Sequence, residues 1–237
     1  AFVFFLGARS QVDARFRKAL LVSAVVVGVA CYHYFRIFES WGGAVADTKV
    51  VEGTMMYMFN TAEFNDAYRY ADWLVTVPLL LVEVVAVLGL SKSQERGFIA
   101  KLSIAAIAML ALGYPGEIAT ETGPRLLWGT LSTIPFIYIL YVLWVELGDA
   151  IEDQPGHAQV LLRNLRLLLL ATWGFYPIAY LAPVIGLGDA TGLVALQVGY
   201  SVADLAAKAG FGLMIFSIAK TKSETAPAAQ GAPAAAE

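Results

Sequence analysis

The sequence contains few charged residues: Asp, Glu, Lys and Arg make up 15% of its 237 residues. A soluble domain of this length carries nearer a quarter. The net charge is −3 and no basic run is interleaved with aromatic residues, which argues against a nucleic-acid partner. Cys31 is the only cysteine, so an intramolecular disulfide and a cysteine-based metal site are excluded. No secretory signal peptide and no internal repeat are visible.

Hydrophobic residues make up 59% of the sequence, and they occur in long apolar blocks. This pattern predicts an all-α membrane protein that crosses the bilayer several times. The opening run AFVFFLG is too short for a span of about 20 residues, and we interpret it as the end of a truncated first helix. Six complete spans are expected at about Ala14–Phe38, Asp66–Leu90, Phe98–Gly113, Gly123–Leu147, Ala158–Leu181 and Asp189–Lys220.

The linkers between these spans are mostly short, so neighbouring helices should be antiparallel in one seven-transmembrane-helix bundle. The long segment after the second helix is polar, with paired glycines and β-branched residues, and predicts a loop with a short hairpin. Residues 221–237 are rich in Ala and Pro without periodicity, which is typical of disorder. We therefore expect a transmembrane domain over residues 1–220, followed by a disordered tail.

The basic residues predict the orientation of this bundle. Eleven Lys and Arg residues fall in the turns after the first, third and fifth spans or at the C-terminal end, and only Arg36, Lys49 and Arg125 fall on the opposite side. Cytoplasmic loops carry the excess of Lys and Arg in membrane proteins. The C-terminus is therefore expected in the cytoplasm.

The third predicted helix carries charged residues, which are rare within membrane spans because charge inside a bilayer is costly. At about 100° per residue, Thr76 and Glu83 lie within about 40° of Asp72, and the two carboxylates are about 16 Å apart along the axis. Arg69 falls on the same face, and Pro78 leaves the Leu74 carbonyl without its helical partner. These groups either bond neighbouring helices or form a functional polar path.

The last predicted helix carries Asp204 and Lys208 four residues apart, so they share a face. A free ammonium in mid-span is expensive. Lys208 is therefore expected either in a buried ion pair or in a Schiff base with a carbonyl cofactor.

Three well-separated segments, RYADWLVTVPLLLVE, TWGFYPIAYL and ADLAAKAGFG, closely resemble the microbial rhodopsins. The pattern Asp72–Thr76–Glu83 is similar to the proton pumps of the proteorhodopsin and xanthorhodopsin branch. The resemblance implies all-trans retinal bound covalently to Lys208 as a protonated Schiff base. It makes Asp72 the main counterion and proton acceptor, and Asp204 the second counterion.

The resemblance also assigns Glu83 as the proton donor from the cytoplasmic side, and places Arg69 just outside the counterions. His33 matches a histidine that pairs with the acceptor Asp72; otherwise a lone membrane histidine is often a bond between helices. Leu80, at the position associated with colour tuning, implies green absorption. The remaining residues of the implied retinal pocket are Trp73, Met109, Gly113, Ser132, Thr133, Trp173, Tyr176, Pro177 and Tyr200.

Gly129 stands where many relatives have Trp. By resemblance to xanthorhodopsin, a glycine there would open a window toward lipid that seats a carotenoid antenna. The alternative is ordinary close packing, since glycine is common at contacts between membrane helices.

Taken together, the resemblance implies a light-driven outward proton pump rather than an enzyme. Its partners would be the lipid bilayer, protons and further copies in a pentameric or trimeric ring, in a bacterial inner membrane. A photosensor of the same fold is the first alternative, although sensors often lack a carboxylate at the Glu83 position. A retinal-free proton-coupled transporter is the second, but such proteins usually show inverted repeats.

Overall fold

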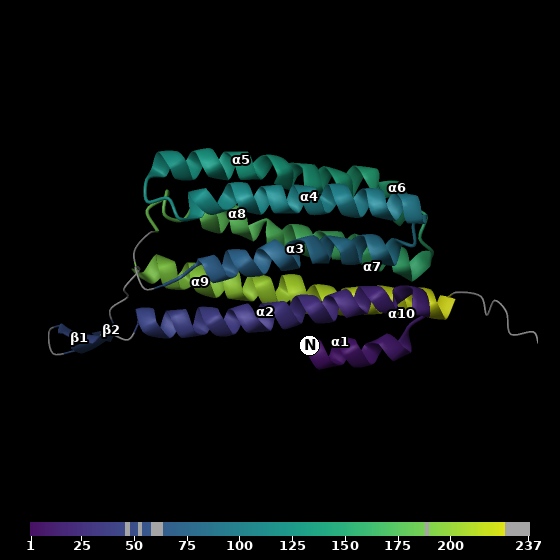
Figure 1. The fold of residues 1–237 in the computed structure, drawn as a ribbon, viewed down its shortest axis with the longest axis horizontal. Helices are drawn as coiled ribbons and strands as arrows, with labels where there is room; N and C mark the ends of the chain where they lie inside the picture. Colours follow the sequence, from purple (N-terminus) through teal and green to yellow (C-terminus); the bar gives the residue numbers. More distant parts are fainter. Residues whose placement is uncertain (46–47, 52–53, 58–63, 188–189, 226–237) are drawn as a thin grey trace, which may run out of the picture.

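A computed structural model describes residues 1–45, 48–51, 54–57, 64–187 and 190–225 (Figure 1). The predicted tail beyond residue 225 and parts of the predicted hairpin loop lie outside the described residues. The elements are α1 (Phe2–Ala8), α2 (Arg17–Ala44), β1 (Thr48–Val51), β2 (Thr54–Tyr57), α3 (Ala67–Leu88), α4 (Lys92–Glu117), α5 (Thr122–Tyr141), α6 (Gly148–Glu152), α7 (Gly156–Trp173), α8 (Phe175–Tyr180), α9 (Ala190–Leu205) and α10 (Phe211–Thr225).

The long helices run side by side along one axis as a single bundle (Figure 1). In chain order α2 packs along α3, α3 along α4 and α4 along α5, while α10 packs against α7 and α2. The short α1 lies beside α2. The turns α3–α4 and α6–α7 lie at the same end of the bundle as the end of α10, which is the end predicted to be cytoplasmic.

Five helical segments among the described residues are long and apolar enough to cross a membrane: 14–44, 67–88, 92–117, 122–146 and 194–225. The predicted span Ala158–Leu181 is interrupted at Gly174 and forms α7 and α8. Pro177 causes this break, because it has no N–H to bond the carbonyl of Trp173 one turn earlier. With the short α1, these segments confirm the predicted seven-helix membrane bundle.

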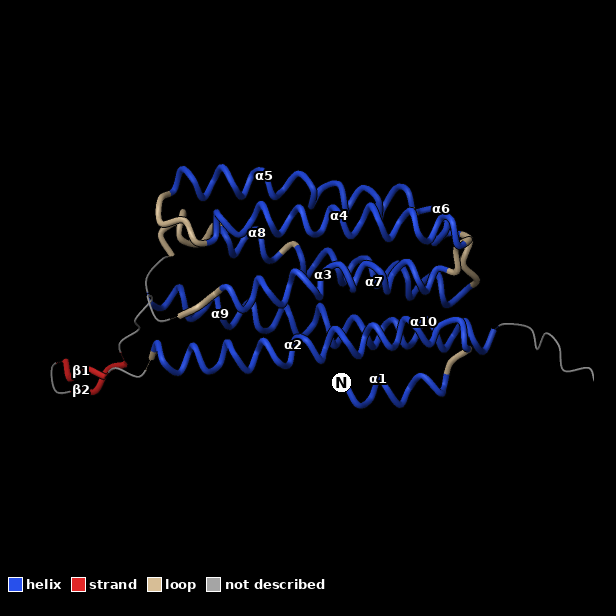
Figure 2. The backbone as a smooth tube through the Cα atoms, in the orientation of Figure 1, coloured by secondary structure: helices blue, strands red, loops and turns tan. Residues whose placement is uncertain are grey.

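The predicted hairpin is also confirmed, as an antiparallel pair in which Thr48 lies opposite Tyr57 and Val51 opposite Thr54. Figure 2 shows it projecting beyond the end of the bundle. It therefore takes no part in the helical core.

Several predicted helix ends are wrong. Helix α2 continues to Ala44 instead of ending near Phe38, and α10 continues to Thr225 instead of Lys220. Helix α4 begins at Lys92, before the predicted Phe98, because Ser91 and Gln94 form a reciprocal cap that starts it there. It also passes the predicted stop at Gly113, because Pro115 falls in the last turn and frees a single carbonyl.

Two π-helical turns, at Val142–Glu146 and Ala206–Gly210, were not predicted. Such turns insert an extra residue into a helix and are frequent at functional sites. The second one contains Lys208. Lys208 nevertheless contacts Asp204 four residues earlier, as the sequence spacing predicts.

The distribution of polar side chains is the reverse of that in a soluble protein. Large apolar residues such as Ile104 and Ile134 are more than 60% exposed on the outer faces of α4 and α5. The bundle interior instead holds buried polar side chains, among them Arg69, Asp72, Glu83, Asp204 and Lys208. Only a lipid environment suits such an exterior. Four of the buried charges form one connected site: Arg69, Asp72, Asp204 and Lys208.

Candidate functional site

Lys208 lies at the centre of the site, 4% exposed, on the π-helical turn between α9 and α10. Its Nζ is 2.7 Å from Asp72 Oδ2 and 2.9 Å from Asp204 Oδ2. Neither contact has the geometry of a hydrogen bond. The structure thus unites two carboxylates from α3 and α9 around one lysine, and it makes the buried ion pair that the sequence predicts.

The two carboxylates differ in how firmly they are held. Asp204 accepts hydrogen bonds from Tyr34 at 2.7 Å, from Trp73 Nε1 at 3.1 Å and from Tyr176. Hydrogen bonds to a carboxylate favour its charged form. Asp204 is therefore fixed as an anion in one orientation.

Neither oxygen of the Asp72 carboxylate accepts a hydrogen bond from the described residues, although both are buried. The Thr76 hydroxyl lies one turn away but donates to the backbone carbonyl of Asp72, at 2.9 Å. The cation nearest to the Asp72 carboxylate is the Lys208 ammonium. A carboxylate that depends on one ion pair takes up a proton readily once that cation is lost.

His33 approaches Asp72 without bonding to it. The distance from His33 Nδ1 to Asp72 Oδ1 is 3.9 Å, whereas the same nitrogen is 3.0 Å from the Val29 carbonyl oxygen. The two side chains are neighbours, and the pairing that the resemblance implies stays a prediction. Any proton shared between them requires the His33 ring to turn.

Arg69 closes the site toward the N-terminal end of α3. Its Nη1 donates to the Tyr34 hydroxyl at 3.0 Å, and its Nη2 donates to Gln197 Oε1 at 2.7 Å. The Asp204 carboxylate is 3.8 Å from Nη1, so Arg69 is the second cation of this anion. A fully buried guanidinium is tolerated here because carboxylates and hydrogen-bond acceptors surround it.

Glu83 lies apart from this cluster, toward the other end of α3, and is 0% exposed. Its one bond partner among the described residues is Ser23 on α2, whose hydroxyl donates to Glu83 Oε2 at 2.8 Å. Its other oxygen is buried without a hydrogen bond. No cation lies within ion-pair distance, so burial disfavours the carboxylate and favours a neutral acid.

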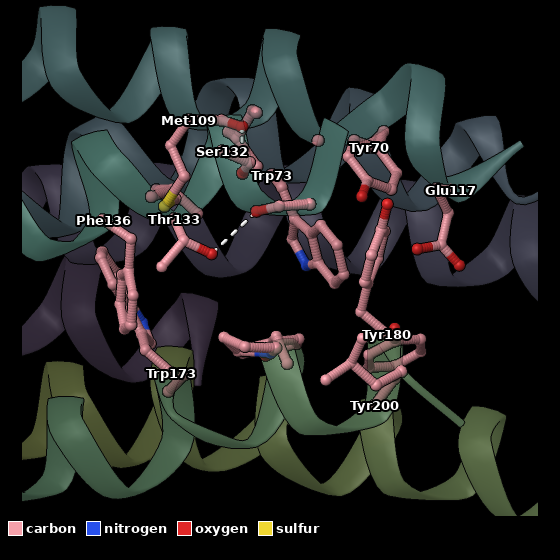
Figure 3. Close-up of a pocket in the computed structure, with 18 of the residues that line it drawn as sticks. Tyr70, Trp73, Met109, Glu117, Ser132, Thr133, Phe136, Trp173, Tyr180 and Tyr200 are labelled. Atoms are coloured by element: carbon pink, nitrogen blue, oxygen red, sulfur yellow. Dashed lines mark hydrogen bonds between the residues drawn. The ribbon is translucent and has the colours of Figure 1, made fainter. Parts of the chain in front are cut away.

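A cavity of about 320 Å³ extends from Lys208 between the helices. Figure 3 shows Trp73 projecting into its middle, with Phe136 and Trp173 toward one end and Glu117 toward the other. All the predicted pocket residues line it: Trp73, Leu80, Met109, Gly113, Gly129, Ser132, Thr133, Trp173, Tyr176, Pro177, Tyr200 and Lys208. Ser132 and Thr133 direct their hydroxyls to the carbonyls of Met109 and Gly129.

Sequence reasoning missed four polar residues of the site: Tyr34, Gln197, Ser23 and Glu117. Gln197 carried a signal, since it lies two helical turns before Asp204 and so shares its face. Tyr34 and Ser23 are single hydroxyls in an apolar helix. Their partners lie on other helices, so only the packing of α2 against α3 and α9 identifies them.

Gly129 is covered by the ring of Tyr180. A Cβ atom at Gly129 would lie 2.6 Å from Tyr180 Cε1, which is closer than van der Waals contact. Leu126 and Leu181, beside it in the cavity wall, are 43% and 39% exposed on the outer surface. The cavity wall near Gly129 thus includes residues with exposed surface, but the Tyr180 ring occupies the space in front of the glycine, and the window that the resemblance implies stays a prediction.

The fold and site define a multi-pass helical membrane protein with a buried lysine at an aromatic cavity. The chain belongs to the bacteriorhodopsin-like protein family, whose model matches residues 1–222. This family binds retinal on a lysine.

Two relatives illustrate the family. A green-light absorbing proteorhodopsin of Gamma-proteobacterium EBAC31A08 is 28% identical over 226 residues, covering 94% of this chain and 82% of that protein. Bacteriorhodopsin-I of Haloquadratum walsbyi is 30% identical over 223 residues, covering 92% of this chain and 82% of the relative.

Two solved structures are more similar still. Xanthorhodopsin, described as a light-driven ion pump with dual chromophore, superposes with a TM-score of 0.85 at 53% identity, covering 94% of this chain and 87% of that one. A thermophilic rhodopsin superposes with a TM-score of 0.86 at 54% identity, covering 94% of this chain and 88% of that one. The predicted family and branch are therefore confirmed.

Proposed function

We propose that this protein is a light-driven outward proton pump with all-trans retinal bound to Lys208. The observation that carries the proposal is the arrangement of acids along α3. Asp72 lies 2.7 Å from the lysine nitrogen, and the buried Glu83 lies about 16 Å further along the same helix. Groups that exchange protons thus stand on both sides of Lys208.

The residues present fit retinal. The cavity is lined mainly by apolar and aromatic side chains, and its volume falls at the lower end of the range of small-molecule sites. Lys208 Nζ lies in the wall of this cavity beside two carboxylates, which would stabilise a protonated Schiff base formed there. When bound, retinal supplies light absorption and the change of shape that upsets the charge balance at Lys208.

The chain's own residues give the transfer its direction. Asp72 accepts the proton, because the hydrogen bonds of Asp204 hold that carboxylate as an anion. Arg69, beyond the carboxylates, is the second cation of Asp204 and helps to hold it as an anion. Glu83, neutral and hydrogen-bonded by Ser23, returns a proton from the other side.

The relatives named proteorhodopsins and the light-driven ion pump xanthorhodopsin support this proposal. A photosensor would have no evident use for the acid at Glu83. The direct test is the pH of an unbuffered suspension of cells that express the protein with retinal. Light-driven acidification that a protonophore abolishes is expected, whereas alkalinisation that a protonophore enhances would contradict proton pumping. A coloured protein that leaves the pH unchanged would favour the sensor.

Replacing Glu83 by Gln should slow return of the proton to the Lys208 nitrogen by at least about 100-fold, the contribution of a positioned general acid. Flash spectroscopy measures this step as recovery of the initial absorption. Ser23→Ala is expected to slow it less, because Glu83 keeps its proton but loses its partner. Equal recovery in Glu83→Gln and the parent protein would remove Glu83 from the donor role.

We also propose that the opening at Gly129 seats a carotenoid antenna. Support comes from the exposed cavity wall around this glycine and from the dual chromophore of xanthorhodopsin. The Tyr180 ring fills the space of a side chain here, so the antenna would lie against that ring.

Gly129→Trp is expected to abolish energy transfer from an added purified carotenoid, because the indole would displace Tyr180 and close the opening. The excitation spectrum of proton pumping measures the transfer. Gly123→Trp is the control, since nothing lies within 4 Å of a Cβ there. An antenna band that survives in Gly129→Trp would mean that the glycine serves close packing alone.

A bacterial inner membrane with the C-terminus in the cytoplasm is the proposed location, supported by the basic residues at one end of the bundle. Acidification of the medium would test this orientation together with pumping. A pentameric or trimeric ring stays a prediction.

A further inference from the structure

Asp66 is a half-buried acid that the proposed pumping cycle does not yet use. It precedes the first residue of α3, outside the membrane-spanning segment. Its side chain is 22% exposed, yet its Oδ1 is buried and accepts no hydrogen bond from the described residues. Burial raises the pKa of the Asp66 carboxyl above its ordinary value, and the nearby Arg69 opposes that rise.

Arg69 lies between two carboxylates. On one side its Nη1 is 3.8 Å from Asp204 Oδ2, and on the other its Nε is 3.6 Å from Asp66 Oδ1. Neither contact has the length of a hydrogen bond. A small movement of the guanidinium therefore strengthens one ion pair at the expense of the other.

The two carboxylates are not equivalent. Asp204 is held by three hydrogen-bonding side chains and by Lys208. Asp66 has a loose ion pair with Arg69, interacts with the Gln197 side chain and the more distant Arg125, and has partial access to the surface. An adjacent cation favours the ionised form of an acid. The proton affinity of Asp66 thus depends directly on where Arg69 sits, and Arg69 senses the charges around Lys208.

We infer that Asp66 is the group through which the pumped proton leaves the protein. This inference rests on the proposed function. A proton that has left Asp72 cannot cross Arg69 by using its guanidinium, because arginine does not give up its own proton. The proton binds the Asp66 carboxylate instead, and approach of Arg69 then releases it to water and restores the anion. One proton enters Asp66 and one leaves in each cycle.

The test is flash-induced proton release from the purified, retinal-loaded protein, followed with a water-soluble pH dye beside the absorption changes. Asp66→Asn should delay the appearance of the proton outside by at least about tenfold, as expected when a proton-transfer group is lost. The first proton transfer to Asp72 should keep its rate. Asp66→Glu should restore fast release, because it keeps a carboxylate.

Glu39→Gln is the matched control, because it removes an exposed carboxylate, paired with Arg36, from the same end of the bundle. It should release protons as the parent does. Release from Asp66→Asn at the parental rate would overturn the inference, and Asp66→Ser replaces Asp66→Asn if that variant yields no pigment. A parent protein that releases no proton at all would instead refute the pumping function itself.

Discussion

Lys208→Ala is expected to give a folded but colourless protein that leaves the pH of a cell suspension unchanged in light. The side chain supplies the only amine within the described cavity lining, so without it retinal has no point of covalent attachment. The variant also leaves Asp72 and Asp204 buried together without the cation between them. The absorption spectrum of the purified protein after addition of retinal is the measurement.

Lys220→Ala is the control for this experiment, because Lys220 is an exposed lysine of α10, the helix that follows the π-helical turn of Lys208. It should bind retinal and acidify the medium as the parent does. Visible absorption retained by Lys208→Ala with retinal added would show that binding does not depend on this lysine. Loss of colour in both variants would point to damage of the helix rather than loss of the attachment site.

Asp72→Asn is expected to keep its colour and lose pumping by at least about 100-fold, the lower range for a positioned proton-transfer group. Asparagine has nearly the same shape but cannot take up the proton. Asp204 cannot substitute, since three side chains hold it as an anion. The initial rate of light-driven acidification, normalised to bound pigment, measures the effect.

Asp72→Glu retains a carboxylate and should retain part of the pumping. The contrast between Asp72→Asn and Asp72→Glu separates loss of the proton acceptor from a general disturbance of the site. Pumping by Asp72→Asn at the parental rate would transfer the acceptor role to another carboxylate. Asp204→Asn would then be the variant to compare, although its loss also removes the partner of Tyr34 and Trp73.

Helix α3 shows which parts of the site could be predicted from the sequence. The angle between successive residues is fixed, so Asp72, Thr76 and Glu83 had to share a face. The same spacing argument predicted that Asp204 and Lys208 share a face. It could not distinguish the two counterions, because their difference comes from the hydroxyl groups of Tyr34 and Tyr176 on other helices.

The helix ends show a second limit. Composition located each apolar block, because a membrane span needs about 20 apolar residues. It did not locate the π-helical turn at Lys208, since that turn depends on how neighbouring helices pack. It also placed Pro177 inside one span without the break at Gly174 that this proline causes. Backbone irregularity of this kind is tolerated in a membrane only where other parts of the protein satisfy it.

The resemblance to the microbial rhodopsins identified the family, and the proton-path roles that it implies stay predictions. The sequence by itself determined the membrane class of the protein, its apolar spans and the acids that share a helix face with one another or with Lys208. These follow from composition and from periodicity within single helices. Only the tertiary structure decided that Ser23 bonds Glu83, that Arg69 stands between Asp204 and Asp66, and that Tyr180 covers Gly129. Each of these contacts joins residues of two different helices or loops, and no local spacing encodes their distance.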